Sequence, residues 1–239
     1  DVVTVAQYAW SSLDSFSFLA IPFYIYAGTL MEYSGISKML INWIGGIIGR
    51  VRGSLGIITI LASMAFGVLT GSAMATISAI GKIVQPQMEK EKYPRGYVAA
   101  LLAATCFLGI LIPPSVPGIM YALSAGIKIS DVWMVTIGPT LIFMVGYITV
   151  NYCRIGRHLP KPEAVSISGT ERLEEFGKNT FRAIPALLMP VIIYGCIYGG
   201  ICTPTEAGAL SAVYGIFYYL ILWFVNKKAI KIDFLTIAA

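Results

Sequence analysis

The chain of 239 residues is 57% hydrophobic and only 12% charged, which is about half the charge of a soluble domain. Its formal net charge is +5, but the basic residues lie between apolar stretches and indicate membrane topology rather than a nucleic-acid surface. A single histidine, His158, and the absence of HExxH, GxSxG, Walker A and GxGxxG patterns argue against an enzyme.

Apolar stretches long enough to cross a bilayer recur along the chain. A membrane-spanning helix needs about 20 apolar residues. The stretches predict an all-α polytopic membrane protein, with the lipid bilayer as solvent for most of the chain: Phe16–Met31, Gly96–Ile112, Val132–Cys153, Ala183–Ile201 and Ala207–Val225. The cysteines form no CxxC pair and are expected to be small buried apolar side chains: Cys106, Cys153, Cys196 and Cys202.

Positive charge sets the expected orientation, because cytoplasmic loops carry an excess of Lys and Arg. No basic residue precedes Lys38, whereas residues 154–182 carry six. The N-terminus is therefore expected in the periplasm and 154–182 as a solvated cytoplasmic loop. Nothing basic lies within 183–225, which predicts two spans that meet in the periplasm near Thr203. The basic segment 227–239 is expected to be a cytoplasmic connector to the rest of a longer protein.

Residues 1–53 are predicted to contain the first span and an arm helix. From Gly35 to Gly49 one helical stripe is apolar, formed by Ile36, Leu40, Ile44 and Ile47. This pattern favours a helix that lies along the cytoplasmic interface. The alternative is a slightly overlong transmembrane helix.

The segment Ser54–Met88 has the wrong length for one crossing or for two. Basic residues flank it on both sides, so both ends are expected in the cytoplasm. One helix would extend about 52 Å, and two crossings need about 40 residues. A re-entrant hairpin with its tip at Thr70-Gly71-Ser72 satisfies both constraints. Non-helical backbone at that depth requires surrounding protein or a polar cavity, so the tip is predicted to belong to a site.

Three prolines divide the next apolar stretch, Gly96–Gly126, into two predicted half-helices. Proline lacks the N–H that would bond the carbonyl four residues earlier. Pro113, Pro114 and Pro117 thereby free the carbonyl oxygens of Gly109, Ile110 and Pro113. One interpretation is a broken helix that offers these oxygens and the Ser115 hydroxyl to a site. The other is a simple proline kink. Residues 131–153 are predicted to form the following transmembrane helix.

Small and hydroxylated residues dominate Thr70–Gly81, TGSAMATISAIG. Ser72, Ala75, Thr76 and Ala79 are spaced to share one helix face, and Ser72 suits the N-cap position. One interpretation is a half-helix whose positive end faces an anion, with nearby oxygens for Na⁺. The other is a packing face for a neighbouring helix.

The sequence Thr203-Pro204-Thr205-Glu206 contains the only carboxylate within 183–226. An acid inside a membrane is a candidate for function. However, Thr203 at the N-cap, Pro204 at N1 and Glu206 at N3 also form a capping box. We favour the cap because it explains all three residues.

Four segments in order resemble the large membrane subunit of tripartite ATP-independent periplasmic (TRAP) transporters, the DctM/SiaM-like family. They cover nearly the whole chain: AIPFYIYAGTLMEYSGIS (Ala20–Ser37), LASMAFGVLTGSAMATISAIG (Leu61–Gly81), LIPPSVPGIMYALSAGIKI (Leu111–Ile129) and IYGGICTPTEAGALSAVYG (Ile197–Gly215).

The resemblance implies that this chain is most of the N-terminal half of a protein built from two inverted repeats in the bacterial inner membrane. It implies an elevator mechanism, in which a transport side, 54–130, moves against a scaffold side, 1–53 and 183–226. It also implies Na⁺-coupled uptake of an organic acid of the C4-dicarboxylate or sialic-acid type. The implied partners are a periplasmic substrate-binding protein and a small four-helix membrane subunit.

The resemblance implies Na⁺ as the coupling ion. The residues that match the family's motifs at the hairpin tip and the proline break would bind it: Thr70, Gly71, Ser72, Ala73, Pro113 and Pro114. Gly109 is added to this site because the prolines free its carbonyl oxygen. The substrate would contact Ser72, Thr76 and Ser115. Many members carry an acidic residue near the position of Thr76, so the ion site here would depend more on carbonyls and hydroxyls. Alternatives are a stand-alone secondary anion transporter of the wider ion-transporter superfamily and a non-catalytic membrane scaffold.

Overall fold

The computed structural model describes residues 1–49, 53–156 and 169–225. These residues form helices and no β-strand, which confirms the all-α class. The helices are α1 (Val2–Leu13), a 3₁₀ turn (Phe16–Leu19), α2 (Ala20–Tyr33), α3 (Ile36–Ile48), α4 (Ser54–Thr70), α5 (Ala73–Lys90), α6 (Arg95–Leu111), α7 (Val116–Ala125), α8 (Ile129–Asn151), a π-helical turn (Tyr152–Gly156), α9 (Gly169–Tyr198) and α10 (Pro204–Val225).

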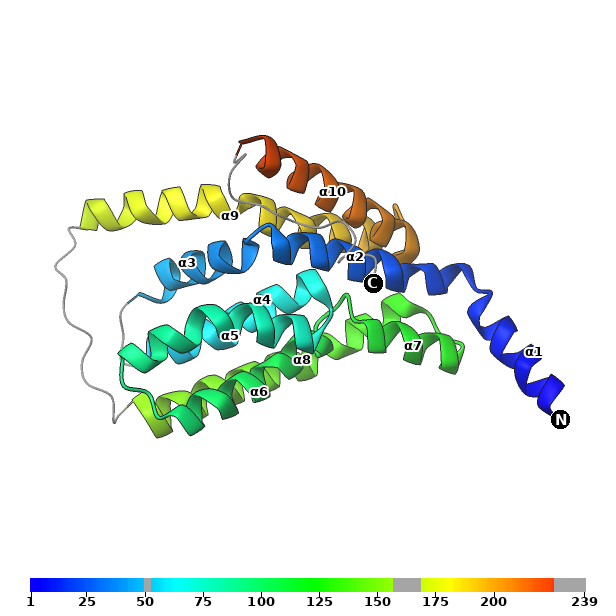
Figure 1. Ribbon diagram of the computed structural model, residues 1–239, viewed down its shortest axis with the longest axis horizontal. Helices are drawn as coiled ribbons and strands as arrows, with labels where there is room; N and C mark the ends of the chain where they lie inside the picture. The colour runs from blue at the N-terminus through cyan, green and yellow to red at the C-terminus, as the bar shows by residue number, and fades with distance from the viewer. Residues whose placement is uncertain (50–52, 157–168, 226–239) are drawn as a thin grey trace.

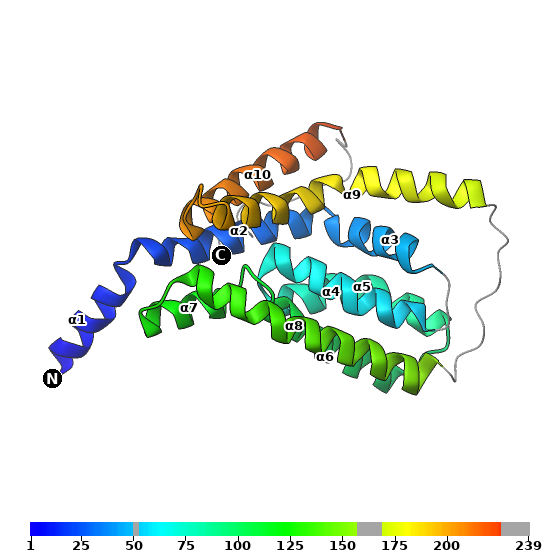
Figure 2. The ribbon, with the colours of Figure 1, turned by 180° about the vertical axis from the view of Figure 1, so that it is seen from behind.

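The helices pack as two groups (Figures 1 and 2). One hydrophobic core contains side chains from both groups. In one group α4 packs against α5, α6 and α8, and α7 continues from α6 at one end. In the other, α2 packs along α10, while α3 lies between α4 and α9. Helix α1 projects away from both groups.

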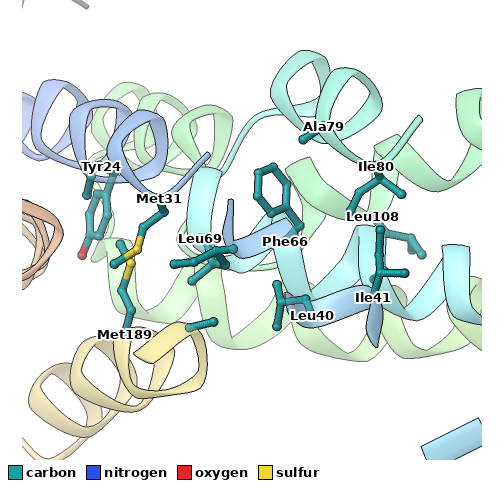
Figure 3. Packing of buried hydrophobic residues seen from close by; sticks show 14 of the residues in the cluster. Tyr24, Met31, Leu40, Ile41, Phe66, Leu69, Ala79, Ile80, Leu108 and Met189 are labelled. Carbon is teal, nitrogen blue, oxygen red and sulfur yellow. The ribbon is translucent and has the colours of Figure 1, made fainter. Parts of the chain in front are cut away.

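Apolar side chains from several helices fill the space between the groups. Phe66 and Leu69 of α4 are buried beside Leu40 of α3 and Leu108 of α6 (Figure 3). If lipid surrounds the helices, close packing rather than expulsion of water holds them together. This packing supports the ends of α4 and α6, where the chain becomes irregular.

A buried amide joins three helices at the opposite end of α4. Asn151, at the end of α8, is fully buried, and its Nδ2 donates to the Gly53 carbonyl at 3.0 Å. Its Oδ1 accepts a hydrogen bond from the Tyr97 hydroxyl of α6 at 2.8 Å. The side chain lies so close to Gly56 that a Cβ there would be 2.0 Å from Oδ1. Asn151 therefore fixes the start of α4 against α6 and α8.

Two described helices, Ile129–Ile155 and Pro204–Phe224, are long and apolar enough to cross a membrane. The pair α6 and α7, bent by 46° at a short break, counts as a third if it forms one span. These three agree with predicted stretches. Ala183–Tyr198 is a shorter apolar helix, so its crossing and that of the first predicted stretch stay predictions.

One sequence prediction needs correction, and one helix was not predicted. The predicted loop 154–182 is helical at both described ends, in Tyr152–Gly156 and from Gly169 onward. Its Glu, Arg and Leu residues favour helix, and no proline follows until Pro185. Residues 157–168 lie outside the described part. Helix α1 was not anticipated, and several of its large apolar side chains, among them Val2, Val5 and Trp10, are exposed.

The predicted arm is a separate helix. Gly35, with φ of 71°, ends the path of α2 before α3 begins, so the chain does not continue as one overlong helix. Ile36, Leu40 and Ile44 of its apolar stripe are buried, whereas Ile47 is exposed. The stripe therefore packs on neighbouring helices, and the place of α3 relative to a membrane surface stays a prediction. So does the connector 227–239, which is outside the described residues.

Candidate functional site

The chain reverses at the predicted hairpin tip. Helix α4 ends at Thr70, and Gly71 follows in the left-handed region with φ of 57°. Its N–H donates to the Gly67 carbonyl at 2.7 Å, which closes the last turn. Ser72 is extended and caps α5, because its Oγ accepts from the Ala75 N–H at 3.4 Å. Glycine and serine thus end one helix and begin the next within three residues.

Hydroxyl groups gather at this tip. Thr76 is fully buried, and its Oγ1 donates to the Ser72 carbonyl at 2.7 Å. Thr70 is nearly as buried, and its Oγ1 accepts from the Ser72 N–H at 3.4 Å. A hydroxyl whose hydrogen is already donated still has lone pairs to offer. The tip therefore presents oxygen atoms suited to a small hard cation.

The second irregular segment is the break between α6 and α7. Ile112 is extended, with ψ of 134°, as expected for a residue before proline. Ser115 caps α7, since its Oγ accepts from the Gly118 N–H at 3.2 Å. The Pro113 carbonyl, predicted to be free, instead accepts a hydrogen bond from the Tyr194 hydroxyl of α9. The broken helix is confirmed, and one of its three freed oxygens already has a partner.

Glycine allows the tip and the break to meet through their backbones. A Cβ at Gly71 would lie 2.5 Å from the Pro114 carbonyl oxygen. One turn deeper, a Cβ at Gly67 would lie 2.2 Å from the Gly109 Cα, and one at Gly109 would lie 2.7 Å from the Thr76 Oγ1. Such distances require hydrogen at each position. The two interrupted segments, 42 residues apart at Gly67 and Gly109, are therefore in direct contact.

A cavity of about 410 Å³ opens at this contact. Its wall includes the first residues of both α5 and α7, so two helix N-termini border the same space. Helix α2 closes one side, where Gly28 approaches Thr70 so closely that a Cβ would be 2.7 Å from its Cα. The lining residues are Ile25, Gly28, Thr29, Thr70, Gly71, Ser72, Ala73, Met74, Ala75, Ile110, Val116 and Pro117.

The predicted site residues of the tip and the break occupy different places, and Pro113 is the one bonded by Tyr194. Thr70, Gly71, Ser72 and Ala73 line the cavity. Pro114 touches the tip at Gly71, and Gly109 and Thr76 touch each other behind it. In contrast, Ser115 faces a separate cavity of about 560 Å³ with Asp131 and Gly118.

The face of α5 that contains Thr76 also serves packing. Thr76 meets Gly109 of α6, and Ala79 is nearly buried. Ser72 and Ala75 on the same face line the cavity. The two interpretations of this face apply to different residues: its first turn borders the cavity, and its second turn packs on α6.

Thr203 and Glu206 lie at the corner between α9 and α10 and outside the residues that line the tip cavity. The Thr203 N–H donates to the Glu206 Oε2 at 2.8 Å, and the Glu206 N–H donates to the Thr203 Oγ1 at 3.3 Å. These reciprocal bonds are those of a capping box. The geometry matches the favoured cap.

The sequence analysis did not predict the contributions of residues on α2 and α9. Gly28, Thr29 and Ile25 line the cavity from α2, and Tyr194 of α9 bonds the proline break. No local pattern marks them, because their role depends on contacts between helices far apart in sequence. Groups of three or more His, Cys, Asp or Glu side chains that could hold a metal ion do not occur among the residues described. Any cation at the tip would be held by carbonyl and hydroxyl oxygens.

The amino-acid sequence of this chain matches a known protein family. The family model described as tripartite ATP-independent periplasmic transporter, DctM component, matches residues 1–236. An isethionate TRAP transporter permease protein of Oleidesulfovibrio alaskensis is 38% identical over 212 residues, which cover 89% of this chain and 33% of the relative.

Two further relatives are similar over the same region. The sialic acid TRAP transporter large permease protein of Vibrio cholerae is 34% identical, with 89% of this chain and 48% of the relative covered. The 2,3-diketo-L-gulonate TRAP transporter large permease protein of Escherichia coli is also 34% identical, with 93% and 51% covered. The chain thus spans about half the length, or less, of the relatives it matches.

All three relatives are named as transporter permeases and not as enzymes. The family match extends over both the hairpin and the broken helix. This chain therefore belongs to the DctM family, the large membrane permease component of tripartite ATP-independent periplasmic transporters.

Proposed function

We propose that this chain is half of the permease of a Na⁺-coupled transporter that takes up an organic acid across the bacterial inner membrane. The observation that carries the proposal is the contact between the hairpin tip and the proline break, through Gly71 and Pro114. Secondary transporters bind ions and substrates where helices are interrupted at mid-depth. Here two interruptions that are separate in sequence share one cavity.

Na⁺ as the coupling ion is supported by the kind of atoms at the tip. Thr70, Ser72 and Thr76 bring hydroxyls. Helix α4 ends at Thr70, so its last carbonyls lack the N–H partners that a continuing helix would supply. Hard cations prefer oxygen ligands. We propose that Thr70, Gly71, Ser72, Ala73, Gly109, Pro113 and Pro114 form the Na⁺ site, with Pro113 contributing through its place in the break.

An organic acid as substrate is supported by the two helix N-termini that border the cavity. Ser72 begins α5 and Ser115 begins α7, and helix N-termini favour negative groups. The relatives are named for isethionate, sialic acid, diketogulonate and C4-dicarboxylates, which are all organic anions. We assign Ser72 and Thr76 to the substrate side of the site, with an acid of the C4-dicarboxylate or sialic-acid type as substrate. Ser115 lines the neighbouring cavity, so in this proposal it contributes by capping α7.

The helix packing supports an elevator mechanism. Helices α4–α7 hold the tip and the break, whereas α2 and α10 form a separate regular pair. In this proposal the first set moves as the transport side, and α2, α3, α9 and α10 belong to the scaffold. A periplasmic substrate-binding protein delivers the acid, and a small four-helix subunit joins the scaffold.

The experiment is uptake of labelled organic acids by the complete three-component system in proteoliposomes. Uptake is expected with a Na⁺ gradient and to disappear with K⁺ in its place. Uptake that persists without Na⁺ contradicts the coupling. Full uptake without the binding protein indicates a stand-alone carrier, and no uptake of any organic acid by a folded complex indicates a scaffold.

A further inference from the structure

Two cysteines flank the turn between α9 and α10. Cys196 is in the last turn of α9, and Cys202 lies just before the start of α10. Gly200, with φ of 70°, reverses the chain between them. The Ile201 N–H and the Cys202 N–H both donate to the Cys196 carbonyl, at 2.9 and 3.1 Å. The turn therefore folds Cys202 back onto Cys196.

This hydrogen bond limits the separation of the two cysteines. With an N···O distance of 3.1 Å, standard bond lengths keep their Cα atoms within about 7 Å. Disulfides join Cα atoms about 4.4–6.8 Å apart. The backbone of the turn therefore places the two cysteines within reach of each other.

Neither cysteine is the buried apolar side chain that the sequence predicted. Both are partly exposed, as oxidation by a soluble protein requires. No Lys or Arg lies within 183–225, and the positive-inside rule therefore places this turn in the periplasm. The bacterial periplasm is oxidising, and disulfides form and persist there.

We propose that Cys196 and Cys202 form a disulfide that closes the α9–α10 corner. The oxidant is a periplasmic thiol–disulfide oxidase. The thiolate of one cysteine attacks the oxidase disulfide and gives a mixed disulfide, and the second thiolate then displaces the oxidase. The two cysteines lose two protons and two electrons, and the oxidase becomes a dithiol. The proposal rests on the topology of the proposed function but not on transport.

The corner that this disulfide would close is already anchored to α2 and to the 3₁₀ turn before it. The Tyr24 hydroxyl donates to the Pro204 carbonyl at 2.9 Å, and the Thr205 Oγ1 donates to the Phe16 carbonyl at 3.4 Å. A covalent link between Cys196 and Cys202 would add the end of α9 to this junction. Its effect would be to hold the proposed scaffold side together at its periplasmic end.

The test is differential alkylation of the full-length protein in cells. Cells are quenched with acid, the protein is unfolded and blocked with light N-ethylmaleimide, and it is then reduced and labelled with heavy N-ethylmaleimide. Mass spectrometry is expected to find heavy label on Cys196 and Cys202 and light label on Cys106 and Cys153. In Cys202→Ser, Cys196 is expected to carry the light label.

Light label on both Cys196 and Cys202 in the native protein overturns the proposal. Heavy label that stays on Cys196 in Cys202→Ser also overturns it, because the partner is then another thiol. These readouts do not depend on uptake. A membrane-impermeant maleimide applied to reduced intact spheroplasts tests the topology separately, and it is expected to label Cys202 and not Cys153.

Discussion

Two chain reversals in this molecule are built from the same local elements and differ in their surroundings. At the hairpin tip, Gly71 is left-handed and Ser72 caps the next helix. At the α9–α10 corner, Gly200 is left-handed and Thr203 caps the next helix. A Cβ at Gly71 would meet the Pro114 carbonyl at 2.5 Å, whereas one at Gly200 would have nothing within 4 Å.

The difference shows what local sequence decides and what it does not. A left-handed glycine followed by a hydroxylated cap is enough to turn a helical chain. Only the tip adds burial and backbone contact with a second irregular segment. In our account that addition separates a binding site from a simple corner.

The largest expected effect is at the close contact between α4 and α6 behind the hairpin tip. Gly67→Ala puts a Cβ 2.2 Å from the Gly109 Cα, and backbone has little room to yield. We expect a loss of about 3 kcal/mol or more in stability, measured as thermal unfolding in detergent. Gly146→Ala on α8 is the control, because a Cβ there meets nothing within 4 Å. Equal stability of the two variants would contradict the close contact between Gly67 and Gly109.

The second-largest expected effect is a difference in uptake between variants of the two left-handed glycines. Gly71→Ala and Gly200→Ala each force alanine into the left-handed region, at about 1–2 kcal/mol. Only Gly71→Ala also meets the Pro114 oxygen. We therefore expect uptake by Gly71→Ala to fall about tenfold or more, as a further 1.4 kcal/mol implies, while Gly200→Ala keeps most of its uptake. Similar uptake by both would remove the distinction between tip and corner.

A smaller effect is expected from the loss of the N-cap hydroxyl at the tip and at the corner. Ser72→Ala and Thr203→Ala each remove an N-cap hydroxyl, and each is expected to cost about 0.5–2 kcal/mol of stability. In our account Ser72 also belongs to the ion and substrate site. The Na⁺ concentration for half-maximal uptake should rise in Ser72→Ala and stay unchanged in Thr203→Ala. A rise in both, or in neither, would argue against a special role for Ser72.

Features set by local chemistry could be predicted from sequence. The hairpin tip, the proline break and the Thr203 cap each depend on residues within a few positions of one another. The contacts Gly28–Thr70, Gly67–Gly109 and Tyr194–Pro113 could not, because each depends on how distant helices pack. The same limit explains why Ser115 was grouped with the tip although it lines a neighbouring cavity.

The most direct measurement of the central claim is Na⁺ binding to the intact permease. Thermal unfolding is followed as NaCl replaces KCl at constant ionic strength, because an ion that binds the folded state raises its stability. We predict a rise in Tm with Na⁺ that is reduced in Thr70→Val and in Ser72→Ala and retained in Thr203→Ala. An equal Tm in Na⁺ and K⁺, or a Na⁺-dependent rise that survives both tip substitutions, would contradict an ion site at the hairpin tip.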